Sequence, residues 1–378
     1  MPSTSRGAHR PQHEIRPHFE EEGLELLAVA EATQDLEAEA EYAAWLDSGA
    51  AGEMQYLHTH SAAKYRPEKM LAGCSSILLV GLGYYQKPPN EEGTPTGTVA
   101  RYAWGRDYHK ALGKPLRRIA RSLEERYSGH RFRAFTDATP LSERHYGARA
   151  GLGFRGRNTL LIHETLGSWF FIGEVLSTLA VEPSEPAPSA RRSCPHGCRA
   201  CIAACPTGAL SGPYRFDARL CISYLTIEHK GVIPRELAQK MGTQVFGCDR
   251  CQEVCPLNRG VSPTTVSGFT SHIAGPEIPL ELLLALRNDD EVRARFAGSP
   301  LLRAKRRGLV RNGVIAAANL LAGYGSAGAA PRPRMQAAPD PELGTALRAK
   351  LESMLRSLAT DEDSVVAAQA AQALQRSR

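Results

Sequence analysis

Apolar side chains follow one another without interruption at Ile77-Leu-Leu-Val-Gly-Leu-Gly-Tyr-Tyr85. An unbroken apolar run of this length predicts a strand buried on both faces. Residues 131–137 alternate polar and apolar positions instead, which predicts a half-buried strand with Asp137 at its end. A further apolar segment at 167–180 predicts a strand that closes the same domain.

Helical spacing of apolar side chains marks three other parts of the chain. Residues 34–47 predict a surface helix, and residues 116–123 place their leucines, isoleucine and alanine on one face of a second helix. From Leu280 onward the pattern is helical, with a Gly- and Pro-rich interruption at 323–341. This last region resembles one or two degenerate helical hairpins of the HEAT type.

Asp137 lies at the predicted junction between a strand and a helix. Thr139 and Pro140 resemble an N-cap and a first helical residue, so we expect the helix to start directly after the strand. In open α/β sheets, ligands bind at the carboxyl ends of strands. Asp137 therefore lies where a ligand is expected.

A glycine motif follows the predicted helix. Gly151-Leu-Gly153-Phe-Arg-Gly156 formally matches the G-x-G-x-x-G of dinucleotide sites. That site requires a strand before the motif, whereas the pattern here is helical. We expect these glycines to let the backbone approach a large flat ligand or a helix.

The chain has 378 residues, which is enough for two or three domains. A Pro- and Ser-rich linker at 182–189 marks a boundary. We expect domains at 1–184, 185–268 and 269–378, of which the last is helical.

Several properties of the chain concern its location and partners. No apolar run is long enough to span a bilayer, and residues 1–18 lack the apolar segment of a secretory signal. Clustered cysteines without such a signal indicate a reducing compartment. The net charge of +6 favours a nucleic-acid partner only weakly. We expect a cytoplasmic protein with no membrane partner.

The chemistry of the chain is concentrated between Cys194 and Pro256. Two local runs of cysteines at steps of three and four, each closed by proline, follow the pattern by which bacterial ferredoxins hold [4Fe-4S] cubes. In two-cluster ferredoxins the last cysteine of each run crosses to the other cube. This logic predicts one cluster on Cys194, Cys198, Cys201 and Cys255, and another on Cys205, Cys221, Cys248 and Cys251.

Two of these ligands depart from the plain ferredoxin pattern. Cys194 lies one residue before the expected slot, which Pro195 occupies, and Cys221 replaces Val245 from a distance. The alternative is two structural zinc sites, because Cys-x-x-Cys pairs also bind zinc. Zinc knuckles do not need a third cysteine followed by proline, so iron-sulfur clusters are favoured. The ninth cysteine, Cys74, precedes an apolar run and is expected to be a buried free thiol.

Several separated motifs, taken together, resemble the epoxyqueuosine reductase family. The similarity runs from about Tyr56 to Asn312. The segments that carry it are Thr136-Asp-Ala-Thr-Pro-Leu-Ser-Glu-Arg144, Gly151 to Ile162, Gly167-Ser-Trp-Phe-Phe171, Cys221 to Gly231, Phe246 to Pro256 and Arg303 to Asn312.

The resemblance implies a fold, an activity and two kinds of cofactor. The fold would be an α/β (α+β) cobalamin-binding domain of the reductive-dehalogenase type, fused to a two-[4Fe-4S] ferredoxin-like module. The activity would be removal of the epoxide oxygen of epoxyqueuosine in a tRNA anticodon loop, giving queuosine. Cobalamin suits the reduction because no side chain is a low-potential two-electron donor. An external low-potential donor would supply the electrons, and the protein would be a monomer.

The resemblance also assigns roles to individual residues. Asp137 matches the general acid, and desolvation is expected to keep it protonated. Lys64 stands where the family usually has an arginine. The candidate corrin neighbours are Lys64, Ala100, Asp137, Gly156, Leu161, Ile172, Ser223, Cys248 and Asp249. The candidate tRNA contacts are Arg144, His229, Lys230, Arg303, Arg306 and Arg307.

The tRNA contacts include a basic run, Arg303 to Arg311, on a predicted helix. Phosphate binding by such a run would depend on salt and little on sequence. A splayed anticodon base would provide the discrimination.

Two other classes of protein share part of these features. A ferredoxin-type electron-transfer module explains the clusters, but it does not explain an acid at a strand end or a basic helix. A reductive dehalogenase uses the same cofactors on a small organohalide. Dehalogenases usually carry a twin-arginine export signal, which residues 1–18 lack.

Overall fold

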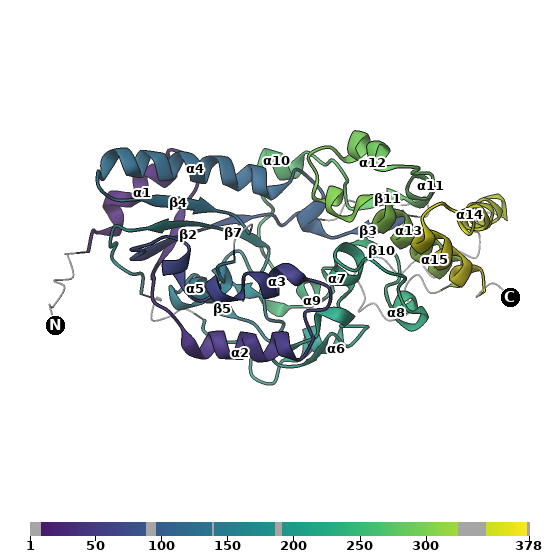
Figure 1. Ribbon diagram of the computed structural model, residues 1–378, viewed down its shortest axis with the longest axis horizontal. Coiled ribbons are helices and arrows are strands. Elements are labelled where there is room, and N and C mark those ends of the chain that lie inside the picture. Colours follow the sequence, from purple (N-terminus) through teal and green to yellow (C-terminus); the bar gives the residue numbers. More distant parts are fainter. Residues whose placement is uncertain (1–8, 88–95, 138–139, 186–190, 324–344, 376–378) are drawn as a thin grey trace. The chain divides into compact units, whose positions relative to one another are not determined.

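The computed structural model describes residues 9–87, 96–137, 140–185, 191–323 and 345–375. Two compact units divide the chain, which passes between them several times (Figure 1). The first unit comprises residues 1–84, 108–198 and 259–262, and the second comprises 85–107, 199–258 and 263–378. The division into three consecutive domains stays a prediction.

A four-stranded sheet in the order β1-β2-β7-β4 forms the centre of the first unit, and all of its neighbouring strands are antiparallel. The three strands expected from the apolar pattern are present as β2, β4 and β7, and β1 is an additional edge strand. The strands of this unit are β1 (Leu26–Glu31), β2 (Ser76–Gly83), β4 (Phe132–Phe135), β5 (Phe154–Arg155), β6 (Leu161–Ile162) and β7 (Phe170–Ser177).

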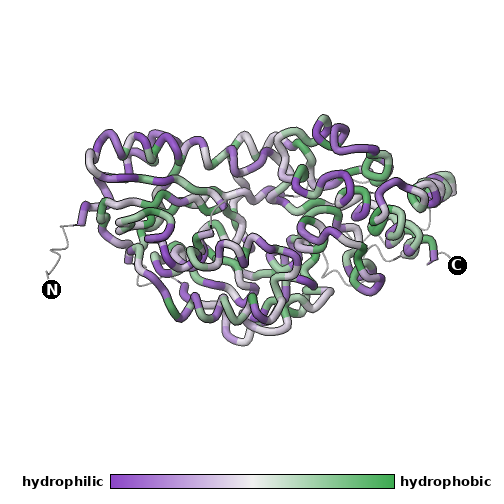
Figure 2. Tube along the Cα trace, viewed as in Figure 1, coloured by the Kyte–Doolittle hydropathy of each residue, from purple (hydrophilic) through white to green (hydrophobic). Residues whose placement is uncertain are grey.

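Helices cover both faces of this sheet, α1 and α4 on one side and α5 on the other (Figure 1). The helices of this unit are α1 (Gln12–Glu20), α2 (Leu36–Asp47), α3 (Gln55–Thr59), α4 (Tyr108–Arg126) and α5 (Glu143–Arg149). Successive residues of β2 alternate between the two cores, with Leu78 facing α4 and Leu79 facing α5. Burial on both faces explains the unbroken apolar run, and Figure 2 shows these strands as hydrophobic.

Two of these helices were expected, and one was not. α2 and α4 confirm the helical spacing of residues 34–47 and 116–123. α1 falls in a segment that reads as polar, yet its Ile15 and Phe19 are fully buried against α4. Two apolar side chains four residues apart anchor this helix, which is too short a pattern to stand out in the sequence.

The expectation for the segment after Asp137 was wrong in its details. Thr139 lies outside the described residues, and the next helix, α5, begins only at Glu143, with Ser142 before it. The rule that placed a ligand at the carboxyl end of a strand concerns parallel strands, whereas β4 pairs antiparallel with β7. Asp137 is therefore part of a loop between β4 and α5.

The second unit combines a small sheet with many short helices. β3 pairs in parallel with β10 and antiparallel with β11. Its strands are β3 (Thr96–Val99), β8 (Leu210–Gly212), β9 (Arg215–Phe216), β10 (Gln244–Phe246) and β11 (Glu277–Pro279). Its shorter helices are α6 (Ala200–Ala203), α7 (Ile222–Ile227), α8 (Arg235–Lys240), α9 (Arg250–Glu253), α10 (Ser267–Thr270), α11 (Leu280–Leu284) and α12 (Asp289–Phe296).

Three longer helices complete the second unit: α13 (Lys305–Leu321), α14 (Thr345–Leu358) and α15 (Ser364–Leu374). α13 is buried along most of its length and packs against both α14 and α15. The expected helical C-terminal region is thus present. Among the described residues, no helix is both long enough and apolar enough to cross a membrane.

Candidate functional site

Asp137 has a strained backbone and an exposed side chain. Its φ of 49° lies in the left-handed region, which costs a residue other than glycine free energy. The Tyr108 hydroxyl, at the start of α4, donates a hydrogen bond to Asp137 Oδ2. The Tyr108 ring is stacked on Phe171 of β7, with centroids 4.1 Å apart. The carboxylate is thus held by a tyrosine that is itself fixed by the sheet.

Lys64 contacts the same loop at Pro140 and Ser142. Its Nζ donates to the carbonyl of Pro140 at 3.3 Å, and its own carbonyl accepts from Ser142 N at 3.0 Å. Burial lowers the pKa of the Lys64 ammonium, while the nearby Glu143 carboxylate opposes that shift. Lys64 and Asp137 therefore belong to one cluster of charges around the loop.

The glycine motif packs against a strand rather than a helix. A β-carbon on Gly153 would lie 2.4 Å from the carbonyl oxygen of Ile162, and one on Gly156 would lie 2.6 Å from Ile162 Cδ1. These glycines therefore allow close approach to β6 and not to a helix, and the expected approach to a large flat ligand stays a prediction. Leu161 on β6 is buried beside α5, and Ile172 on β7 packs at the edge of the same core.

The other candidate corrin neighbours lie together in the second unit, around Gly247. Ala100 N donates to the carbonyl of Phe246 at 2.8 Å, and Gly247 N donates to Thr226 Oγ1 at 2.9 Å. Thr226 Oγ1 in turn lies 2.8 Å from the carbonyl of Ile222 and 3.1 Å from that of Ser223, which share its hydrogen. This chain of bonds joins Ala100 and Ser223 to the loop that carries Cys248 and Asp249.

Asp249 is buried in an ion-pair network that the sequence did not reveal. Its Oδ2 accepts from Arg101 N at 2.7 Å and lies 3.4 Å from Arg101 Nη1. Arg101 Nη1 also contacts Glu253 Oε1 at 2.8 Å. These carboxylates raise the pKa of the Arg101 guanidinium, although burial opposes them. The partners are far apart in the sequence, so no local pattern could have identified the network.

The four cysteines assigned to one cluster come together within the second unit. Cys248 and Cys221 both lie close enough to Cys251 to act on its thiol electrostatically, as does Cys201 of the other assigned cluster, and Cys205 acts on Cys221 in the same way. Burial raises the pKa of the Cys248 thiol to about 12, and that of Cys251 rises as well. Cys221 therefore lies beside Cys248 and Cys251 despite its distance in sequence.

The cysteines of the other assigned cluster belong to both units. In the first unit, Arg157 N donates to Cys194 Sγ at 3.4 Å, and the Arg157 guanidinium donates to the carbonyl of Cys198. In the second unit, Cys201 and Cys255 are buried. Hydrogen bonds to cluster sulfurs tune the reduction potential. Arg157, within the motif from Gly151 to Ile162, is a candidate for this role that the sequence analysis did not name.

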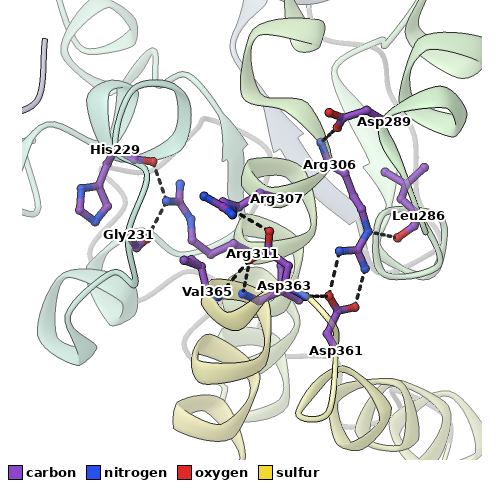
Figure 3. Close-up of polar contacts among 11 residues, drawn as sticks. His229, Gly231, Leu286, Asp289, Arg306, Arg307, Arg311, Asp361, Asp363 and Val365 are labelled. Atoms are coloured by element: carbon purple, nitrogen blue, oxygen red, sulfur yellow. Dashed lines mark hydrogen bonds and ion pairs between the residues drawn. The ribbon is translucent and has the colours of Figure 1, made fainter. Parts of the chain in front are cut away.

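Three arginines of the basic run from Arg303 to Arg311 pair with acidic side chains, and Figure 3 shows the pairs of Arg306 and Arg307. Arg306 forms a two-pronged ion pair with Asp361, and its side chain is only 14% exposed. Arg307 contacts Asp363 at 2.7 Å and is 50% exposed. Arg303 precedes α13 and contacts Glu228 at 2.7 Å. Each of these three arginines thus has an acidic partner within the chain.

Arg311 was expected to belong to the same basic surface, and that expectation was wrong. Its side chain is fully buried, and Nη1 donates to the carbonyls of His229 and Gly231 at 2.7 and 2.9 Å (Figure 3). Nη2 donates to the carbonyl of Leu225 at 2.6 Å. Arg311 therefore fixes the end of α7 and the loop after it, and it is not available to phosphate.

The remaining tRNA candidates, Arg144, His229 and Lys230, each lie 3.3–3.4 Å from a backbone carbonyl oxygen. Arg144 on α5 is exposed, and its Nη1 donates to the carbonyl of Thr159 at 3.3 Å. Lys230 Nζ donates to the carbonyl of Ile227 at 3.4 Å, and His229 Nε2 lies 3.3 Å from the carbonyl of Val232. His229 and Lys230 thus lie on the loop that Arg311 supports.

Two protein families match this chain. Residues 194–258 match the family described as "4Fe-4S double cluster binding domain". Residues 64–138 match "Epoxyqueuosine reductase QueG, DUF1730". The first match contains all eight cysteines assigned to the clusters, and the second contains both Lys64 and Asp137.

Curated relatives resemble the chain over most of its length. Epoxyqueuosine reductase of Pseudomonas aeruginosa is 40% identical over 280 residues, covering 73% of this chain and 76% of that protein. Epoxyqueuosine reductase of Francisella cf. novicida is 36% identical over 305 residues, covering 78% of this chain and 84% of that protein.

Solved structures share the fold. A selenomethionine-labelled epoxyqueuosine reductase aligns with a TM-score of 0.82 at 23% identity, covering 97% of this chain and 90% of that one. The enzyme from Streptococcus thermophilus aligns with a TM-score of 0.80 at 24% identity and the same coverage. An epoxyqueuosine reductase with a modified tRNA stem loop gives 0.79 at 23% identity, covering 97% and 98%. Because its curated relatives are similar over so much of its length, the chain belongs to the epoxyqueuosine reductase family.

Proposed function

We infer that this chain is an oxidoreductase that reduces epoxyqueuosine to queuosine in tRNA. Membership of the epoxyqueuosine reductase family carries this inference. Two [4Fe-4S] clusters bound by the cysteines of residues 194–258 would carry the electrons, and the grouping of Cys205, Cys221, Cys248 and Cys251 supports this.

Cobalamin is the second cofactor that we propose. The residues fit such a group: Asp137 and Lys64 offer an acid and an ammonium at one loop, and the corrin carries amide side chains that hydrogen-bond to such groups. When bound, it supplies the low-potential electron pair that no side chain can provide. The proposed neighbours are those assigned by resemblance: Lys64, Ala100, Asp137, Gly156, Leu161, Ile172, Ser223, Cys248 and Asp249.

Asp137 is the proposed proton donor. Its side chain is exposed and oriented by Tyr108, so it is accessible to a substrate. Bound cofactor and substrate would cover this side chain and shield it from water.

The tRNA would be held by surface cations, for which we retain Arg144, His229, Lys230, Arg303, Arg306 and Arg307. Exposure supports Arg144, Arg303 and Arg307 most strongly, since all three can reach a phosphate. Arg306 would act mainly through its ion pair with Asp361, by holding α13 in place. The low-potential electron donor, the monomeric state and the cytoplasmic location complete the proposal.

The deciding experiment is nucleoside analysis of tRNA from a strain that lacks this gene. Accumulated epoxyqueuosine that disappears on complementation supports the function, and unchanged queuosine refutes it. The site is tested with Asp137→Asn, which we expect to retain cobalamin absorbance and tRNA binding while losing turnover. Near-normal turnover by this variant would remove Asp137 from the reaction, whatever the tRNA analysis shows.

A further inference from the structure

The proposed reaction consumes more protons than Asp137 holds. When an epoxide oxygen leaves as water, two carbon–oxygen bonds break, one carbon–carbon double bond forms and two oxygen–hydrogen bonds form. The balance requires two electrons, which the external low-potential donor supplies through the clusters, and two protons. A single carboxylic acid gives one proton and must be reloaded before it can give another.

A second carboxyl lies fully buried behind the Asp137 loop. Glu174 on β7 is 0% exposed, and neither carboxyl oxygen has a hydrogen-bond partner among the residues that the structure describes. In the sheet register Glu174 is opposite Phe135 of β4, two residues before Asp137, and opposite Leu79 of β2. Residues directly opposite one another share a face of the sheet. Glu174 therefore lies on the face covered by α5.

The charged groups around Glu174 favour its protonated form. Burial raises its pKa well above the ordinary value, and the carboxylates of Glu143 and Asp137 raise it further, whereas Lys64 opposes them. Burial also raises the pKa of Glu143, at the start of α5, and the positive charge of the neighbouring Arg144 opposes this shift. The residues directly opposite Glu174 on β2 and β4 are the apolar Leu79 and Phe135. Arg133 of β4 lies on the same face of the sheet, and the Cys74 thiol is close enough to interact electrostatically with Glu174. A buried carboxyl without a partner is far more stable neutral than charged.

We propose that Glu174 stores the second proton of the reaction and passes it to Asp137 after Asp137 has protonated the substrate. The proton would move from the Glu174 carboxyl to the Asp137 carboxylate. Glu143, which is partly exposed and interacts electrostatically with Glu174, would reload Glu174 from solvent. Glu174 does not touch the substrate, so it is a positioning residue for this proton. The proposal rests on the proposed role of Asp137.

The protonation state of Glu174 can be measured without turnover. Infrared spectra of the purified full chain at neutral pH are expected to show a protonated carboxyl band that shifts in D₂O. The band should be lost in Glu174→Gln and retained in Glu125→Gln, which changes an exposed residue of α4. A wild-type spectrum without such a band shows that Glu174 is ionised, and this ends the proposal even if no variant folds.

The transfer itself is tested by the kinetics of the reconstituted enzyme. Glutamine keeps the shape of the side chain but holds no transferable proton. We expect Glu174→Gln to lower kcat at least about tenfold with an unchanged KM for tRNA, and small acidic buffers to restore part of the rate. Unchanged kcat, or a loss that no buffer rescues, would show that Glu174 only fills space.

The two proposals fail in different ways. If Asp137→Asn stays active, Asp137 is not the proton donor, and proton transfer from Glu174 to Asp137 is refuted as well. The infrared band of Glu174 would still be present in that case. If Asp137→Asn is inactive and Glu174→Gln is fully active, Asp137 remains the proposed proton donor. Only the storage of the second proton by Glu174 is then refuted. Far-ultraviolet circular dichroism of each variant verifies that it folds.

Discussion

The hydroxyl of Tyr108 donates a hydrogen bond to the carboxylate of Asp137, and the Tyr108 ring is stacked on Phe171. The bond joins the first turn of α4 to the loop after β4, two segments that are 29 residues apart. It holds the proposed proton donor in one orientation while the backbone of Asp137 is strained.

Removing the Tyr108 hydroxyl is expected to slow turnover. A hydrogen bond to a charged group contributes about 1.5–3 kcal/mol, so Tyr108→Phe should lower kcat by about tenfold or more. Steady-state reduction of modified tRNA measures the effect, and cobalamin absorbance should be unchanged. Tyr214→Phe, at an exposed position of the second unit, is the matched control. Equal losses in the two variants would contradict a specific role for Tyr108.

Replacing Cys221 is expected to remove one cluster and leave the other. Cys221→Ser should lower the iron content of anaerobically reconstituted protein from about eight irons per chain toward about four. The matched control is Cys74→Ser, because Cys74 is a buried thiol whose pKa is raised to about 12 by burial and which lies far from the cysteine runs in sequence. Full iron content in Cys221→Ser would exclude Cys221 as a ligand and require another residue in its place.

Arg306 and Arg307 are neighbours that should differ in their effect on stability. Arg306→Ala leaves the mostly covered Asp361 carboxylate without its cation, which should lower the free energy of unfolding by about 2 kcal/mol. Arg307→Ala breaks a pair that is half exposed, which should cost about 0–1 kcal/mol. Urea unfolding monitored by circular dichroism compares the two. Similar losses would mean that burial does not distinguish these pairs.

The same two variants also separate stability from tRNA binding. Arg307→Ala should weaken tRNA binding more at low salt than at high salt, because released counterions make phosphate contacts salt-dependent. If Arg307→Ala binds tRNA as the wild type does at low salt, Arg307 does not contact tRNA and only pairs with Asp363 at the surface.

Glu174 should make the stability of the protein fall as pH rises. Its pKa is raised in the folded state, so above an unfolded value of about 4.3 only the folded chain keeps the proton. Unfolding then releases a proton, and the free energy of unfolding falls by up to about 1.4 kcal/mol per pH unit until the folded pKa is reached. Glu174→Gln removes this dependence, so the stability of the variant relative to the wild type should increase as pH rises above the unfolded value. Parallel curves for the two proteins would contradict a raised pKa.

The elements that depend on local pattern were predictable. The unbroken apolar run became β2, the alternating run became β4, and the helical spacing of residues 116–123 became α4. α1 was not predicted, because only two apolar side chains anchor it. α5 begins at Glu143, later than Thr139 and Pro140 suggested. Start signals are weak when the loop before a helix is held by distant contacts, as Lys64 holds Pro140.

Sequence alone determined the chemistry that depends on spacing and residue type: the cysteine runs, the acid after a strand and the motifs of the family. Tertiary structure decided which charges meet. It paired Arg306 with Asp361, buried Arg311 among carbonyl groups and enclosed Glu174 between the sheet and α5. The physical reason is that a charge and its distant partner leave no periodic signal in the sequence, whereas their burial sets both the free energy and the pKa of each group.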